Sequence, residues 1–298
     1  MIKSRILIGI FIVMFCGCMA DKVITSNATV IFSMGEVVLT DQGGNEKSIR
    51  QGDVIKKGAN LETGNDSQCT IQVGEKALVK ILENTSVKVE KLFDNGVNAL
   101  YLEKGKVLSK VHKLKKNNEY NVRTETSLAA VRGTTFSVSY YPGKNIVAVS
   151  KGKVEVTRFA EEEIKELAEQ GETIVVTDTV RVRDISEIEE LELTKIDQVE
   201  FIRTSSEIKG DKGKHLEESL KNKDEEIDKK IEELKENQLP KTLGEIKERY
   251  NRIDEITLYS GKVYRGVILS RGSSFKILTT SGTITVPKNK IKRTRIVN

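Results

Sequence analysis

The sequence has no tryptophan, three prolines and three cysteines among its 298 residues, and only one long apolar run. Sparse proline with an ordinary glycine content excludes collagen-like and proline-rich low-complexity chains. The single apolar run lies at the N-terminus, which excludes a polytopic membrane protein. With 38% hydrophobic and 31% charged residues, the chain is long enough to fold around at least one real core.

The sequence also lacks the short motifs of common enzyme classes. It contains no GxSxG elbow, phosphate-binding loop, HExxH motif or EF-hand loop. His112 and His215 stand in unrelated contexts, and neither belongs to a motif that pairs a histidine with a nucleophile or with metal-binding cysteines. We therefore predict a protein that is not an enzyme, with no metal site and no cofactor.

Charge is nearly balanced, with 49 Lys and Arg residues against 44 Asp and Glu residues and a net charge of +5. This excess is too small to indicate nucleic acid as a partner, and no aromatic pattern of an RNA-binding strand accompanies it.

The first eighteen residues are typical of a secretory signal. Lys3 and Arg5 precede an apolar block from Ile6 to Phe15, and small residues then end at Cys18. The junction resembles a bacterial lipobox, so we predict acylation of Cys18 after cleavage, with simple secretion as the alternative. Two or three acyl chains would hold such a protein on a membrane, whereas one chain is a marginal tether.

The cysteines that remain follow from this assignment. If Cys16 leaves with the signal and Cys18 is modified, Cys69 is the only other cysteine, and an intramolecular disulfide is ruled out. We interpret Cys69 as a small buried hydrophobe rather than a reactive thiol.

Residues 29–183 show short runs of period two that Gly, Asn and Asp interrupt at intervals of about ten residues. The pattern predicts an all-β domain. Gly-x-Val units at Gly35, Gly105 and Gly152 each open an apolar run, and glycine permits positive φ there at low cost. Two explanations fit the repeat: an internal duplication, or independent use of the same glycine turn at the end of several hairpins. Within this region, the spacing of Ile164 and Leu167 predicts a short helix between residues 160 and 170.

Residues 184–254 are rich in Glu, Lys, Ile and Leu, and we expect a charged helical region or spacer. Apolar residues from Leu216 to Leu234 form a thin stripe, Pro240 interrupts it, and a second amphipathic helix follows from Leu243. A coiled coil and a packed helical hairpin or spacer both fit the stripe.

The last segment, residues 255–298, alternates β-branched and polar residues around two Ser-Gly turns. It predicts about five short strands, enough for a small SH3-like barrel. It holds nine Lys and Arg residues against one acid, Glu255. Protection of strand edges and anion binding both explain this charge. The candidate anion-binding patch consists of Lys288, Lys290, Lys292, Arg293 and Arg295.

Residues 35 to about 177 resemble the FecR-like domain, named for the periplasmic part of a regulator of ferric citrate uptake. The resemblance rests on these ordered pieces: Gly35-Glu36-Val37, Gly52-Asp53 with Thr63-Gly64, Asn84-Thr85-Ser86, Leu102-Glu103-Lys104-Gly105-Lys106-Val107, and the block from Thr124 to Val138 that contains Ala130-Val131-Arg132-Gly133-Thr134-Thr135-Phe136. The overall order of signal, FecR-like domain, charged helices and basic β module is similar to envelope lipoproteins of spirochaetes.

The resemblance has a limit. Members of the family that control sigma factors have a cytoplasmic region and a spanning helix before the periplasmic domain. This sequence has only a signal before residue 18, so we expect no direct contact with a sigma factor and do not infer control of iron uptake.

The most specific block contains Arg132, and strand alternation places Arg132, Thr134 and Phe136 on one side of a strand. An arginine beside Phe136 is expected to be partly buried and to need a carboxylate. Its candidate partners are Asp53, Glu62 and Asp66. Gly133 would allow another backbone to approach closely. We interpret Arg132-Gly133-Thr134 as structural rather than as a ligand site.

The fold class predicted is thus mainly β: a FecR-like all-β domain, charged helices and a small C-terminal barrel. We expect a lipid-anchored envelope protein, in the outer rather than the inner membrane, that acts as a binding or scaffold module. A signalling protein that relays an envelope state to a membrane receptor, and a host-facing adhesin, are the alternatives. The expected partners are the membrane, through the anchor, and a protein or an anionic envelope polymer. The sequence does not indicate an oligomeric state.

Overall fold

The computed structural model describes residues 28–94, 96–160, 163–237 and 240–297. The predicted signal at residues 1–18, with Cys18, lies outside these residues. The chain divides into two compact units. The first holds the residues up to Ile185 and Ile196–Leu220, and the second holds Ser186–Lys195 and the chain from Lys221 onward.

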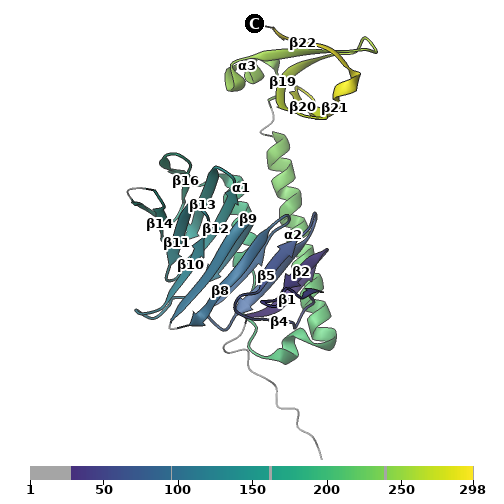
Figure 1. Cartoon of the computed structure of the whole chain (residues 1–298). Helices are drawn as coiled ribbons and strands as arrows, with labels where there is room; N and C mark the ends of the chain where they lie inside the picture. The colour runs from purple at the N-terminus through teal and green to yellow at the C-terminus, as the bar shows by residue number, and fades with distance from the viewer. Residues whose placement is uncertain (1–27, 95, 161–162, 238–239, 298) are drawn as a thin grey trace, which may run out of the picture. The chain divides into compact units, whose positions relative to one another are not determined.

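The first unit contains two β-sheets that share one long strand (Figure 1). Sheet I has the strand order β4–β1–β6–β7–β9–β12–β13–β16–β17. Its strands are β1 (Ala28–Met34), β4 (Val54–Ile55), β6 (Gln68–Val73), β7 (Ala77–Ile81), β9 (Val97–Val111), β12 (Thr135–Tyr141), β13 (Lys144–Lys151), β16 (Glu172–Val176) and β17 (Val180–Asp184).

Sheet II has the order β3–β2–β5–β8–β9–β10–β11–β14–β15. Its further strands are β2 (Val37–Thr40), β3 (Glu46–Ser48), β5 (Asn60–Thr63), β8 (Ser86–Asp94), β10 (Glu119–Arg123), β11 (Ser127–Val131), β14 (Val154–Arg158) and β15 (Ile164–Ala168). Hairpins along the chain alternate between the two sheets, which explains the regular turn signals of the sequence.

Strand β9 belongs to both sheets because it changes partners along its length. Its first half pairs with β8 and, in parallel, with β10, and its second half pairs with β7 and β12. Gly105 lies at the change, where its φ is +94° and its Cα approaches Thr85 so closely that a side chain would collide. Only glycine adopts this conformation without strain, so Gly105 lets one strand pass from one sheet to the other.

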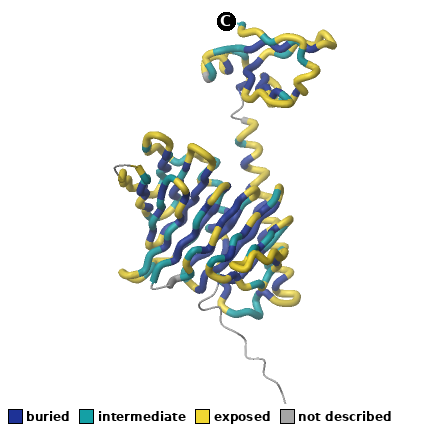
Figure 2. Tube along the Cα trace, viewed as in Figure 1, coloured by how far each residue is buried: buried dark blue, intermediate teal, exposed yellow. Residues whose placement is uncertain are grey.

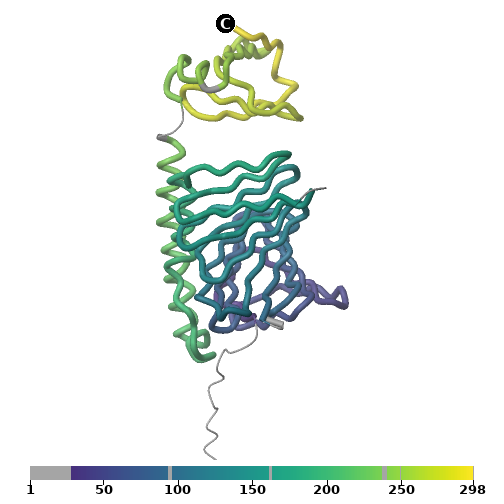
Figure 3. The backbone as a smooth tube through the Cα atoms, turned by 90° about the vertical axis from the view of Figure 1, so that its left-hand side faces the viewer, coloured from purple at the N-terminus to yellow at the C-terminus, as the bar shows by residue number. Residues whose placement is uncertain are grey.

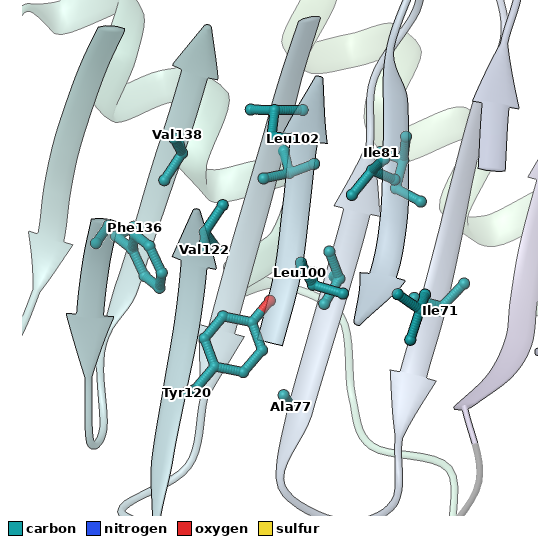
Figure 4. Packing of buried hydrophobic residues seen from close by; sticks show 14 of the residues in the cluster. Ile71, Ala77, Ile81, Leu100, Leu102, Tyr120, Val122, Phe136 and Val138 are labelled. Carbon is teal, nitrogen blue, oxygen red and sulfur yellow. The ribbon is translucent and has the colours of Figure 1, made fainter. Parts of the chain in front are cut away.

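The hydrophobic core lies between the two sheets. Leu100 and Val122 enter it from sheet II, and Ile71 and Phe136 enter it from sheet I, as Figure 4 shows. The Tyr120 ring meets the Phe136 ring edge to face, with the centroids 6.1 Å apart. Alternate residues of each strand therefore form the core, and Figure 2 shows the resulting bands of buried and exposed residues.

The helix predicted between residues 160 and 170 is wrong. Ile164–Ala168 forms strand β15, which pairs with β14 from Arg158↔Ile164 to Val154↔Ala168. The spacing of Ile164 and Leu167 is compatible with either structure, and pairing with a neighbouring strand decides between them. Both side chains are exposed, at 37% and 49%, so they are not the buried stripe that a helix would need.

Three α-helices and a short 3₁₀ helix follow sheet I in the sequence. They are α1 (Glu187–Asp197), η1 (Ser205–Ile208), α2 (Gly210–Asn237) and α3 (Leu243–Tyr250). Leu220, Ile227 and Ile231 of α2 are buried, and in the second unit Lys195 of α1 pairs with Asp228 of α2. The apolar stripe is therefore packed within the chain. None of the helices in the described residues combines the length and apolarity needed to cross a bilayer.

The second unit ends in a five-stranded antiparallel sheet of order β21–β20–β19–β18–β22. Its strands are β18 (Ile253–Leu258), β19 (Val263–Arg271), β20 (Ser274–Thr279), β21 (Gly282–Pro287) and β22 (Ile291–Val297), with a 3₁₀ turn, η2 (Lys288–Lys290), between the last two. Ile256 and Ile277 form its core, and Ile246 of α3 packs against Val267 and Leu278. The strands are as predicted, and closure into an SH3-like barrel stays a prediction.

Candidate functional site

The most specific sequence block corrects the prediction for Arg132. Strand β11 ends at Val131 and β12 begins at Thr135, so Arg132 and Gly133 lie in the connection between the two sheets rather than within a strand. Arg132 is exposed and forms no ion pair with the described residues, Asp53, Glu62 and Asp66 included. Strand alternation does not continue through this turn, so the predicted burial of Arg132 is wrong.

The rest of the block joins the two sheets at this turn. Gly133 lies close to the backbone that follows β9: an added Cβ would be 3.0 Å from the Lys113 Cα. This confirms the expected close approach of another backbone segment. The Thr134 hydroxyl donates to the Lys153 carbonyl oxygen at 2.8 Å. Gly152, with a φ of +86°, lies against Gly133 and Thr134. These residues hold sheet I against sheet II by backbone approach.

A second junction lies at the other end of β11. The Asn145 amide donates to the Thr124 hydroxyl at 3.0 Å and to the Ser127 hydroxyl. The Tyr140 hydroxyl donates to Glu125 at 2.6 Å, and this bond, together with burial, raises the pKa of Tyr140 to about 12. The block from Thr124 to Phe136 is therefore a pair of sheet-to-sheet junctions around one strand.

The outer face of sheet I is buried. A row of neighbouring residues runs across this face from β6 to β16, and all of its members are at most 3% exposed: Thr70, Lys80, Leu108, Ser137, Ala148 and Thr173. Polar residues in such a row lose contact with water, so they need partners inside the protein.

The segment from Gln198 to Thr204, which we call the strap, crosses this outer face. The Gln72 amide donates to the Ile202 carbonyl and accepts from the Ile202 N–H, both at 2.7 Å. The Lys110 ammonium donates to the Asp197 and Val199 carbonyls, at 2.6 and 2.9 Å, near the C-terminal end of α1. His112 stacks against Phe201. The start of α2, in green, runs along one side of the strands of this unit in Figure 3.

The outer face of sheet II has the opposite character. The matching row runs from β8 to β15 and consists of Lys88, Tyr101, Arg123, Leu128, Thr157 and Lys165. Of these only Thr157 is buried, and the three cations are exposed. We call this surface the open face. A half-buried tyrosine and leucine between exposed cations form a surface that can exchange water for a partner.

A depression of about 340 Å³ lies at one end of the open face. Its lining includes Ala130, Arg132, Lys153, Glu155 and Leu167. Lys153 pairs with Glu169, and Lys165 lies 3.8 Å from Glu155. Arg132 thus lines a small depression and forms no ion pair with the described residues, so a ligand site at this residue stays an alternative.

The candidate anion-binding patch in the second unit consists of exposed residues, but they are not equivalent. Lys288 and Lys290 belong to η2, and Lys292, Arg293 and Arg295 belong to β22. Glu255 lies between Arg265 and Arg295, at 3.2 and 2.6 Å. Burial raises the pKa of Glu255, but the two guanidinium groups outweigh that effect and hold it below its ordinary value. Arg295 therefore already shares a carboxylate partner with Arg265 within the sheet.

Metal-ligand clusters and reactive thiols are two common sources of catalytic chemistry. No group of His, Cys, Asp and Glu in the described residues could hold a metal ion. Cys69 is fully buried, as predicted, and burial raises the pKa of its thiol to about 12. A thiol with this pKa stays protonated and unreactive at neutral pH.

Part of the chain matches a known protein family. Residues 59–155, from the start of β5 to the first residues of β14, match the model of the FecR protein family. The region carries both junctions and most strands of the open face. It is a third of the chain, and the FecR-like resemblance of the sequence is confirmed for this part. The comparison with curated proteins finds no match.

Two solved structures show a weaker likeness. Both are crystal structures, at 1.65 and 2.50 Å resolution, of a candidate anti-sigma factor from Parabacteroides distasonis. Each is 19% identical over 47% of this chain, with a TM-score of 0.39, and this chain spans 64% of its length. At this TM-score the likeness supports no conclusion about fold or function.

Sequence reasoning missed the open face and the strap. The alternation of β9 and β11 marks Tyr101 and Leu128 as facing away from the core, but their neighbours become visible only through strand register. The bond between Gln72 and Ile202 joins residues 130 positions apart, and no local pattern signals it.

Proposed function

We propose that this chain is a non-enzymatic regulatory protein of the bacterial cell envelope whose FecR domain binds a protein partner through the open face. The observation that carries the proposal is the family match over residues 59–155. The match supports the signalling alternative better than the scaffold interpretation that the sequence analysis placed first. No observation favours the adhesin alternative.

The open face fits a protein partner by its chemistry. Tyr101 and Leu128 offer apolar area in the middle of the row, and Lys88, Arg123 and Lys165 flank them. Aromatic residues and arginines are enriched where proteins bind each other, and few of them carry most of the binding energy. A partner with an apolar centre and acidic margins is complementary to this surface.

Location in the envelope rests on the sequence. We propose lipid attachment at Cys18 and, since no Asp follows that cysteine, the outer rather than the inner membrane. Fractionation of cells that carry wild type or Cys18→Ala tests the anchor. After a high-salt wash that removes electrostatic binding, wild type should stay in the membrane fraction and the variant should leave it. A variant that stays would overturn the anchor.

The functional proposal is tested by crosslinking in cells. A photoreactive amino acid replaces Tyr101 on the open face, and in a second strain it replaces Tyr141, which is 56% exposed at the β12–β13 turn. We expect one defined membrane protein to be captured from position 101 and not from position 141.

The competing functions give different results. Capture of wall polymer or of many abundant envelope proteins from position 101 would support the scaffold interpretation and overturn the regulatory one. For a regulatory role, Tyr101→Glu must also reproduce the change in gene expression that follows deletion of the gene. Wild-type gene expression in the Tyr101→Glu strain would contradict the proposal.

A further inference from the structure

The exposed charge of the terminal sheet has one sign. Residues 251–298 contain two acids, Asp254 and Glu255, whose side chains are only 2% and 9% exposed. Asp254 accepts from the Ile268 N–H and pairs with Arg252, and Glu255 pairs with two arginines as described above. Both acids are therefore neutralised inside the sheet, and its outer surface presents cations alone.

Some of these cations gather with an aromatic side chain at one end of β18. The β18–β19 turn carries Tyr259 and Lys262, and its Tyr259 N–H donates to the Lys290 carbonyl at 3.0 Å. That bond brings η2, with Lys288 and Lys290, against the turn. We call these four residues the cationic tip. In the described part of the chain its three lysines form no ion pair.

The tip is also apolar at its end. Tyr259 is 71% exposed, the highest value for a large hydrophobic residue among those the structure describes, and Val263 beside the turn is 47% exposed. A soluble polyanion would need only the lysines, and it would leave this tyrosine in water. Tyrosine with lysines around it is instead the combination found where proteins meet the headgroup region of a bilayer.

We infer that the cationic tip binds the surface of an anionic phospholipid bilayer. Its lysines attract the acidic headgroups, each adding to the affinity in a salt-dependent way, and Tyr259 inserts its ring between them. This contact is separate from the proposed anchor at Cys18 and from the partner of the open face, so it can fail without either of them.

The absence of tryptophan from the chain makes a local reporter available. The full chain with Tyr259→Trp has a single indole at the tip, and Tyr141→Trp provides a matched reporter on the FecR domain. Vesicles of phosphatidylglycerol are compared with vesicles of phosphatidylcholine and with a soluble polyanion, polyglutamate.

The expected result is a blue shift of Tyr259→Trp emission with the anionic vesicles, no shift with the neutral ones, and no shift of Tyr141→Trp with either. Binding to polyglutamate without a vesicle-induced shift would overturn the inference in favour of an acidic polymer. An equal shift of both reporters would overturn it in favour of binding elsewhere on the chain.

The lysines are tested in the Tyr259→Trp background. Lys288→Gln with Lys290→Gln should lower vesicle binding roughly tenfold or more, because it removes two of the three lysines at the tip. Lys115→Gln with Lys116→Gln, in an exposed loop of the FecR domain, removes the same charge and should leave binding unchanged. Equal losses in the two double variants would show a net-charge effect and contradict the inference.

Discussion

The outer faces of the two sheets of the first unit have opposite surroundings, although the same kind of alternating strand makes both. The row from Thr70 to Thr173 on sheet I is buried, and the row from Lys88 to Lys165 on sheet II is mostly open. Sheet I receives the strap, which satisfies Gln72 and Lys110. The outer face of sheet I packs against the strap of its own chain and so contributes to stability. The open face of sheet II is available for binding a partner.

The largest effect is expected in the core that both sheets share. Phe136 is fully buried against Tyr120, and Phe136→Ala should lower the free energy of unfolding by about 3–5 kcal/mol. Chemical denaturation measures it, with Leu167→Ala, at 49% exposure, as a control that should change stability by less than about 0.5 kcal/mol. A loss below about 1 kcal/mol for Phe136→Ala would show that the sheets do not share a packed core.

The next effect separates the two faces. Gln72→Ala leaves the Ile202 N–H and carbonyl without their partner, so we expect a loss of about 1–3 kcal/mol and faster proteolysis within the strap. Asn121 lies in β10 on the same side of the strand as Arg123 of the open face. Asn121→Ala removes the same kind of amide there and should have little effect on either measurement. If proteolysis of the strap is unchanged in Gln72→Ala, the strap is not held by this bond.

A smaller effect is expected at the junction between the sheets. Thr134→Val keeps the shape of the side chain but removes the hydrogen bond to the Lys153 carbonyl. The free energy of unfolding should fall by about 1 kcal/mol, as thermal or chemical denaturation can measure. Stability equal to wild type would mean that backbone approach at Gly133 and Gly152 holds the junction without the hydroxyl.

The smallest effect is expected for Arg132→Ala. The side chain is exposed and unpaired among the described residues, so stability should change by less than about 0.5 kcal/mol. A loss of more than about 2 kcal/mol in thermal unfolding would restore the buried arginine that the sequence analysis expected. Comparing the stability losses of Arg132→Ala and Thr134→Val shows which of these two residues of the turn stabilises the fold.

The sequence was informative where a local rule decides the structure. Period two identified the strands, and the glycines at Gly35, Gly105 and Gly152 have the positive φ that was expected. Cys69 was correctly assigned to the core because a small apolar residue in an alternating strand has few other roles. The FecR resemblance rested on the same turns and is confirmed over residues 59–155.

Local sequence patterns gave wrong predictions where contacts between residues distant in sequence determine the structure. Ile164 and Leu167 fit a helix by spacing, but β14 makes the segment a strand. Arg132 was placed on the Phe136 face because alternation was continued across Gly133, where the chain leaves one sheet for the other. Which outer face is covered depends on the strap, more than a hundred residues from Gln72, and alternation alone treats the two faces alike.

The central claim is that the open face, and not the covered one, binds the partner. The most direct measurement is the affinity of the protein captured through position 101 for the purified chain, for Tyr101→Glu and for Tyr141→Glu. We predict a Kd at least about tenfold weaker for Tyr101→Glu and unchanged for Tyr141→Glu. Equal affinity of all three proteins would contradict the account.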